Sequence, residues 1–111
     1  AILGAANLGD IGTHFPDTSE ELKGIDSKIL LKKVAQMLKK EGYEIGNVDC
    51  TVTLESPKIV PYIPEMKKIL AETLKIPSKN ISIKATTTEQ LGFVGREEGV
   101  CAYAICLLMG Y

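Results

Sequence analysis

Residues 48–86, VDCTVTLESPKIVPYIPEMKKILAETLKIPSKNISIKAT, decide the fold. Apolar and polar residues alternate with a period of two over residues 48–54 and again over residues 81–86, which predicts two strands that each bury one face. Between them, Pro61 and Pro64 suit the first turn of a helix that carries its apolar residues toward the sheet. A strand, a helix of roughly fourteen residues and a second strand predict a parallel βαβ unit with a right-handed crossover.

The flanking residues add helices and a third strand. Residues 1–8, AILGAANL, predict the last turns of a buried helix, and residues 9–18 predict a loop. Asp26 or Ser27 is expected to cap a further helix that stops at Gly42. Its expected apolar face consists of Ile29, Leu30, Val34, Met37 and Leu38.

A loop with three glycines, residues 92–99, leads to a last strand at about residues 100–108, which is free to return antiparallel. The predicted fold class is therefore α+β, a mixed sheet with helices on one face, in a single domain of residues 1–111. Tyr103 and Ile105 alternate with Ala102 and Ala104, so both faces of the last strand are apolar. Burial of both faces suggests oligomerisation.

The composition excludes several classes of protein. Thirteen basic and fourteen acidic residues leave a net charge of −1, so no global basic field attracts nucleic acid or an anionic membrane. The cysteines, Cys50, Cys101 and Cys106, are odd in number and form no CxxC pair, which indicates buried free thiols in a reducing compartment. The single histidine, His14, is expected to lie in a solvated loop.

Two segments near the C-terminus are candidates for binding phosphate. Residues 84–89, KATTTE, place three hydroxyls and a carboxylate at the end of a strand, where they could hold phosphate oxygens and Mg²⁺. Residues 92–99 carry Arg96, whose guanidinium suits phosphate or carboxylate. The alternative interpretations are a polar strand tail and a surface loop with an Arg–Glu pair.

Two further segments could bind other parts of a ligand. Asp10 and Asp17, in GDIG and FPDT, could bind a polyol or a metal, although both are also ordinary turn formers. The backbone of residues 56–58, SPK, could contact a base edge while Lys58 meets a phosphate, or the segment could simply end the strand. Neither GxxxxGK[ST] nor GxGxxG occurs in the sequence.

The segments LGDIG, FPDT, KGIDS, GYEIGNVDCTV, SPK-x-x-PYIPEM and IKATTTEQLGFVGREEG occur in this order over essentially the whole chain. Together they resemble the 2-C-methyl-D-erythritol 2,4-cyclodiphosphate synthase family of the non-mevalonate isoprenoid pathway. The resemblance implies a lyase that converts 4-diphosphocytidyl-2-C-methyl-D-erythritol 2-phosphate to the cyclic diphosphate and CMP. It also implies a homotrimer with active sites between subunits, in the bacterial cytoplasm, or in a plastid if the source is a plant or alga.

The resemblance further implies roles for individual residues. The loops that contact the methylerythritol part are Asp10, Ile11 and Gly12, then Phe15, Pro16, Asp17, Thr18 and Ser19, with Ser19 where aspartate is common. The wall that holds cytosine is Leu54, Glu55, Ser56, Pro57, Lys58, Ile59 and Val60, with Lys58 near the phosphates.

The same resemblance implies that Thr86, Thr87 and Thr88 hold phosphate, with Thr87 as the catalytic residue that stabilises the transition state. Glu89 resembles the ligand of a Mg²⁺ or Mn²⁺ ion. Phe93 and Arg96 would line the threefold axis, where some family members hold an isoprenoid diphosphate, and Glu98 would pair with Arg96.

One departure from the family pattern concerns zinc. The family's zinc ligands are an Asp-x-His pair and a helix histidine, which would lie upstream of residue 1, and His14 does not replace them. We therefore expect the chain to be the C-terminal part of a longer domain. The alternative function is a non-catalytic trimeric binding protein for cytidine nucleotides or isoprenoid diphosphates.

Overall fold

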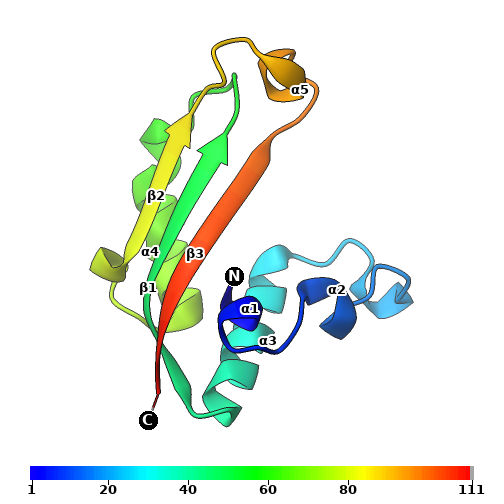
Figure 1. Cartoon of the computed structure of the whole chain (residues 1–111), viewed down its shortest axis with the longest axis vertical. Coiled ribbons are helices and arrows are strands. Elements are labelled where there is room, and N and C mark those ends of the chain that lie inside the picture. The colour runs from blue at the N-terminus through cyan, green and yellow to red at the C-terminus, as the bar shows by residue number, and fades with distance from the viewer. Residues whose placement is uncertain (111) are drawn as a thin grey trace.

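The computed structural model describes residues 1–110, which form a three-stranded sheet with helices on one face (Figure 1). The strands are β1 (Tyr43–Thr53), β2 (Ile81–Thr86) and β3 (Cys101–Gly110), in the order β2-β1-β3. β1 pairs with β2 in parallel and with β3 antiparallel. The predicted βαβ unit with a returning strand and the α+β fold class are therefore confirmed.

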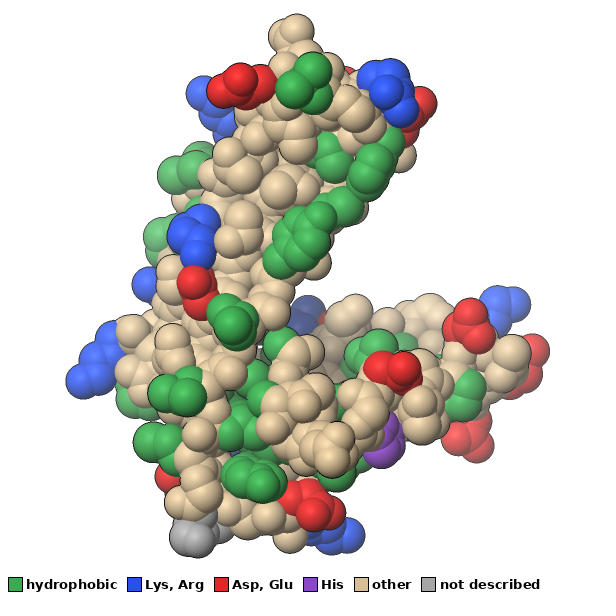
Figure 2. All heavy atoms as spheres, viewed as in Figure 1, with side chains coloured by type: hydrophobic (Ala, Val, Ile, Leu, Met, Phe, Trp, Pro, Cys, Tyr) green, Lys and Arg blue, Asp and Glu red, His purple; other side chains and the backbone are tan. Residues whose placement is uncertain are grey.

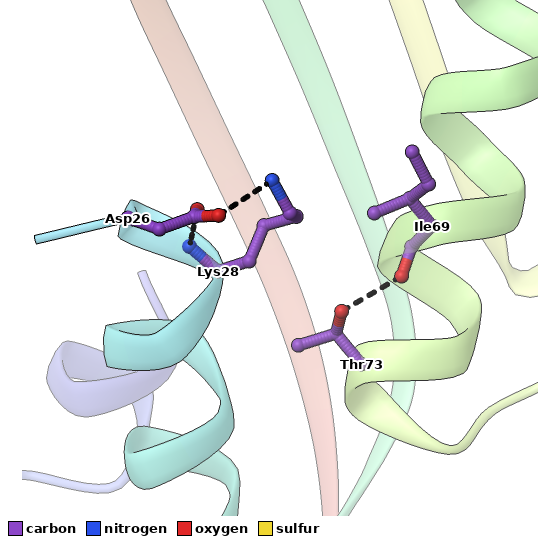
Figure 3. A network of polar contacts seen from close by, with 4 residues as sticks. All are labelled: Asp26, Lys28, Ile69 and Thr73. Atoms are coloured by element: carbon purple, nitrogen blue, oxygen red, sulfur yellow. Dashed lines mark hydrogen bonds and ion pairs between the residues drawn. The ribbon is translucent and has the colours of Figure 1, made fainter.

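The crossover helix α4 (Ile63–Leu74) follows the short 3₁₀ helix η2 (Val60–Tyr62). Ala71 of α4 packs with Ile81 and Ile83 of β2 in one buried cluster. The Thr73 hydroxyl donates to the Ile69 carbonyl at 2.8 Å, so this polar side chain is satisfied inside the helix (Figure 3). A further 3₁₀ turn, η3 (Ser78–Asn80), leads into β2.

Helix α3 (Ser27–Lys40) begins at the predicted cap. The Asp26 carboxylate accepts a hydrogen bond from the Lys28 backbone N–H at 2.9 Å. It also forms an ion pair with the Lys28 Nζ, at the same distance of 2.9 Å (Figure 3). Val34 and Leu38 are buried as expected, but the placement of Ile29 on the apolar face is wrong, because its side chain is 47 % exposed. The buried stripe passes instead through Leu31, Val34 and Leu38, at i, i+3 and i+7.

Strand β1 begins earlier than the alternation in the sequence predicted. The pairing with β3 shifts register between Ile45 and Asn47, which places an extra residue, Gly46, in β1. A Cβ on Gly46 would lie 3.2 Å from the Leu107 carbonyl oxygen, so the backbones approach closely there. The bulge interrupts the period of two and hides the first half of the strand from a periodicity argument.

The N-terminal region is more helical than predicted. Helix α1 (Ile2–Ala5) buries Ile2 and Leu3 against α3 and β1, as expected. The predicted loop at residues 9–18 is wrong in part, because it contains α2 (Ile11–His14), and η1 (Glu20–Leu22) follows.

His14 does not lie in a solvated loop, so that prediction is wrong as well. The residue is half-buried at the end of α2, and its Nε2 lies 2.6 Å from the Leu8 carbonyl oxygen. The physical reason is the short α2 turn, which directs the ring back toward the chain segment after α1. His14 therefore has a structural contact within its own chain.

The face of the sheet opposite the helices is partly apolar (Figure 2). Tyr103, Ile105 and Leu107 of β3 are each more than 60 % exposed on it, beside the exposed Lys84–Asp49 ion pair. Ala102 and Ala104 on the other face of β3 are also exposed, because α3 packs on β1 and α4 on β2. Both faces of this strand are apolar, as the sequence indicated, but on the helix side only its first half is open, because Cys106 and Leu108 pack on the core.

The thiols and the helices of residues 1–110 have two further properties. Within them the three cysteines are free and half-buried, and burial raises the pKa of the Cys50 and Cys106 thiols. None of the helices in this range combines the length and the apolar character needed to cross a membrane.

Candidate active site

Three of the four candidate segments meet at one end of the sheet. Because β1 and β2 are parallel, their carboxyl ends reach the same edge, and the Leu54 N–H extends the ladder by donating to the Thr86 carbonyl at 3.0 Å. The loop after β1 therefore lies beside the residues that follow β2 (Figure 1). We call residues 86–91, which contain the three threonines, the threonine segment, and its final turn from Thr88 to Leu91 the threonine turn. This is the edge at which open α/β sheets usually bind ligands.

The threonine segment ends in a tight turn with unusual backbone angles. The Leu91 N–H donates to the Thr88 carbonyl at 3.0 Å, and the two central residues, Glu89 and Gln90, have φ of 53° and 67°. Positive φ at both central positions is the type I′ pattern, which glycine and asparagine normally fill. Here neither residue is of that kind, so the turn must be held from outside.

Gly95 supports the turn from one side. It lies in α5 (Gly92–Gly95), a short helix inside the segment that was predicted to be a loop. A Cβ at position 95 would lie 2.1 Å from the Gln90 carbonyl carbon, a distance that no real Cβ tolerates. Only glycine fits between the helix and the turn.

Glu55 holds the turn from the loop after β1. Its Oε1 accepts hydrogen bonds from the backbone N–H groups of Thr88 at 2.9 Å and of Gln90 at 3.3 Å. The Thr88 hydroxyl lies 3.1 Å from the same oxygen and 2.7 Å from the Leu91 carbonyl, and its single proton can serve one of them at a time. These bonds, the one from the Thr88 N–H above all, lower the pKa of the Glu55 carboxyl.

The side chains that the turn presents are exposed and suited to an anionic ligand. Thr86, Thr87 and Glu89 are exposed, and the Glu89 N–H donates to the Thr87 hydroxyl oxygen at 3.2 Å. Lys58 is also exposed, in the neighbouring loop after the cis Ser56–Pro57 peptide. Hydroxyls, a lysine and backbone N–H groups bind phosphate oxygens, and a carboxylate binds a divalent cation.

A second contact joins the same two loops. The Ser56 hydroxyl donates to the Glu97 carboxylate at 3.1 Å. The predicted Arg96–Glu98 pair is confirmed, with Nε and Oε1 2.9 Å apart and both side chains more than half exposed. Phe93 and Arg96 are exposed at this end of the molecule.

The remaining candidate segment, with the motifs GDIG and FPDT, lies elsewhere. Asp10 accepts from the Thr13 N–H at 2.9 Å and from its hydroxyl at 2.7 Å, so it caps α2, and these bonds lower the pKa of Asp10. In Figure 1, α2 lies beside α3, away from the end that carries α5. Phe15 packs on the core, whereas the FPDT residues after it are exposed. Within one chain the segments GDIG and FPDT therefore do not reach the threonine turn.

The metal-binding capacity of residues 1–110 is limited. They contain no group of three or more His, Cys, Asp or Glu side chains placed to hold a metal ion. The single Glu89 carboxylate fits a different kind of site. Mg²⁺ is commonly held by one or two carboxylates together with substrate phosphates.

Residues 1–109 match the model of the YgbB family. Curated relatives named 2-C-methyl-D-erythritol 2,4-cyclodiphosphate synthase include one from Parabacteroides distasonis, 59 % identical over 108 residues, and one from Cytophaga hutchinsonii, 58 % identical over 109 residues. The matches cover 97 % and 98 % of this chain but 67 % and 69 % of the relatives. The chain therefore spans about two thirds of the length of these relatives.

Two solved structures show the same fold. The bifunctional IspDF from Campylobacter jejuni matches with a TM-score of 0.96 and 41 % identity, over all of this chain and 30 % of that one. IspF from Plasmodium falciparum, in a CDP complex, matches with a TM-score of 0.85 and 35 % identity, over 98 % of this chain and 65 % of that one.

Proposed function

Because this chain belongs to the YgbB family, whose curated relatives are cyclodiphosphate synthases, we propose that it carries out their reaction as part of a 2-C-methyl-D-erythritol 2,4-cyclodiphosphate synthase. In that reaction the 2-phosphate of 4-diphosphocytidyl-2-C-methyl-D-erythritol 2-phosphate attacks the β-phosphorus, the cyclic diphosphate forms and CMP leaves. The observation that carries the proposal is the threonine turn, held at the carboxyl edge of the sheet beside the SPK loop.

Positioning and charge neutralisation dominate catalysis of phosphoryl transfer. The hydroxyls of Thr86, Thr87 and Thr88 would hold the diphosphate, and Thr87 would donate to the oxygens that gain charge in the transition state. Lys58 would approach the same phosphates from the neighbouring loop. The backbone around it, residues 54–60, would form the wall against cytosine.

Glu89 would hold the Mg²⁺ or Mn²⁺ ion beside the phosphates. When bound, such an ion neutralises phosphate charge and orients the reacting oxygens. The exposed carboxylate of Glu89 lies at the turn that also carries Thr87, which supports this assignment. Zinc would require ligands beyond residues 1–110.

We also propose that the protein is a homotrimer with active sites between subunits. The GDIG and FPDT segments, in and after α2, lie away from the threonine turn of their own chain, so a neighbouring subunit would supply them. The open apolar side chains on β3, among them Ile105 and Leu107, would be covered at the trimer interface. Phe93 and Arg96 would then line the axis and bind an isoprenoid diphosphate. The expected location is the bacterial cytoplasm, or a plastid if the source is a plant or alga.

The test is CMP release by the protein expressed from its complete reading frame, with Zn²⁺ and Mg²⁺ present. Thr87→Ala is expected to lower kcat about 100-fold, as loss of a transition-state hydrogen bond does. Glu89→Gln is expected to raise the Mg²⁺ concentration needed for half-maximal rate. Unchanged turnover and Mg²⁺ dependence in both variants would show that these assignments are wrong.

The second candidate is a non-catalytic trimeric binding protein for cytidine nucleotides or isoprenoid diphosphates. The lack of a zinc-type cluster within residues 1–110 is the observation that favours it. CDP binding by calorimetry without any CMP release would support this candidate over the synthase. CMP release that depends on Thr87 would exclude it.

A further inference from the structure

We propose that Glu55 is a positioning residue, whose carboxylate holds the turn from Thr88 to Leu91 so that Thr87 and Glu89 face the ligand. This inference rests on the proposed function, because the ligand is the diphosphate of that reaction. It also differs from the expectation drawn from the family resemblance, which placed Glu55 only in the wall against cytosine. In the structure the Glu55 carboxylate faces the turn.

The turn needs an external support because of its backbone. Glu89 and Gln90 are consecutive residues in the left-handed region, at φ of 53° and 67°, and neither is glycine. L-residues with a Cβ occupy this region at a cost in free energy and persist there only where the surrounding contacts impose it. The hydrogen bond between Leu91 and Thr88 closes the turn, but an isolated Glu-Gln pair would not select this geometry.

Glu55 supplies that selection from outside the turn. One oxygen, Oε1, accepts from the N–H groups of Thr88 and Gln90, which flank Glu89 on either side. These N–H groups belong to the Thr87–Thr88 and Glu89–Gln90 peptides, so a single oxygen fixes the peptide at the start of the turn and the one at its centre. Hydrogen bonds from backbone N–H groups to a carboxylate are charge-assisted and are stronger than bonds between neutral groups.

The placement also leaves the reactive groups free. Glu55 contacts the Thr88 and Gln90 N–H groups and the Thr88 hydroxyl, whereas the Thr87 hydroxyl and the Glu89 carboxylate remain exposed. Within residues 1–110, Glu89 forms no ion pair. Gly95 contacts Gln90 from the side of α5, so the turn is confined between the loop after β1 and the short helix that follows the turn itself.

The first experiment measures hydrogen exchange of individual backbone amides by NMR. Glu55→Leu removes the acceptor, Glu55→Gln keeps a neutral oxygen at the same place, and Glu72→Leu on the exposed face of α4 controls for loss of a charge. Exchange at Thr88 and Gln90 should quicken at least about tenfold in the leucine variant, less in the glutamine variant, and not at all in the control. Unchanged exchange at both amides in Glu55→Leu would overturn the proposal.

The second experiment measures CMP release by the same variants in the protein from its complete reading frame. Glu55→Leu should lower kcat about tenfold or more, with a smaller change in KM, because misplacement of reacting groups affects the transition state most. Glu55→Gln should recover most of that loss. Equal losses in the two variants would show that charge, and not the held turn, is what matters, and would overturn the proposal.

The two experiments separate the proposals. If the unmodified protein releases no CMP but the exchange pattern holds, the proposed function fails and the holding role of Glu55 stands. If Glu55→Leu does not fold, an acid titration of the unmodified protein decides the matter. The Thr88 and Gln90 amide resonances must then shift together as Glu55 is protonated, and their failure to do so would overturn the proposal.

Discussion

Two polar regions of this molecule, the carboxyl edge of the sheet and the region around α2 and the start of α3, are held together by different kinds of hydrogen bond. At the carboxyl edge of the sheet the hydrogen bonds join residues far apart in sequence, 33 positions between Glu55 and Thr88 and 41 between Ser56 and Glu97. Around α2 and the start of α3 they join near neighbours, three positions between Asp10 and Thr13 and two between Asp26 and Lys28. The first region is therefore organised by the whole fold, whereas the second is organised by local capping.

The largest loss of stability is expected from a substitution at Gly95, beside the turn at the carboxyl edge of the sheet. Gly95→Ala would place a Cβ 2.1 Å from the Gln90 backbone, and the turn cannot yield without losing its bonds to Glu55. Overpacking of this kind destabilises by about 1–3 kcal/mol or more, measurable as a lower urea midpoint. The matched control is Gly99→Ala, whose Cβ would meet the Phe93 ring at an ordinary 3.5 Å. Equal destabilisation by both substitutions would contradict the close approach at Gly95.

An intermediate loss of stability is expected when the protein is acidified. The pKa of Glu55 lies below its ordinary 4.5 and that of Asp10 below its ordinary 3.8, both because of hydrogen bonds in the folded state. A depressed folded-state pKa stabilises the fold fully above the ordinary value, and this stabilisation is lost as the pH falls through the lowered value. Stability should thus decline below about pH 4.5. Glu55→Gln should flatten this decline, and an identical pH profile would count against the Glu55 bonds.

The smallest effect on stability is expected from a substitution near α2, where the hydrogen bonds join near neighbours in sequence. Asp10→Ala removes the cap of α2 but no contact to a distant segment, so it should increase the exchange of the Thr13 amide and leave β1 and β2 unchanged. Far-UV circular dichroism and exchange measurements would check this. Loss of protection in β1 would show that the region around α2 is coupled to the sheet after all.

The sequence predicted the framework of the fold for clear physical reasons. Alternation with a period of two marked β2 and the second half of β1, and the prolines marked the start of α4. The cap at Asp26 followed from local side-chain chemistry. The family resemblance correctly predicted the pair between Arg96 and Glu98.

Other features were not predicted, because a periodic pattern of apolar residues does not reveal them. The bulge at Gly46 concealed the start of β1, and the short helices α2 and α5 occupy stretches rich in glycine. Ile29 has helical spacing but no partner to pack on, which only the placement of α3 reveals. No pattern around Glu55 indicates an anchor, because its hydrogen-bond donors lie in another segment.

By itself, the sequence determined the order of elements, the parallel pairing, the family and the residue types of the candidate site. These depend on local propensity, on periodic burial and on motifs within short stretches. Only the tertiary structure decided that Glu55 and Gly95 enclose the turn at Glu89, and that the GDIG loop lies away from it. Such contacts arise when parallel strands bring their carboxyl ends to one edge, and their partners are set by packing in three dimensions.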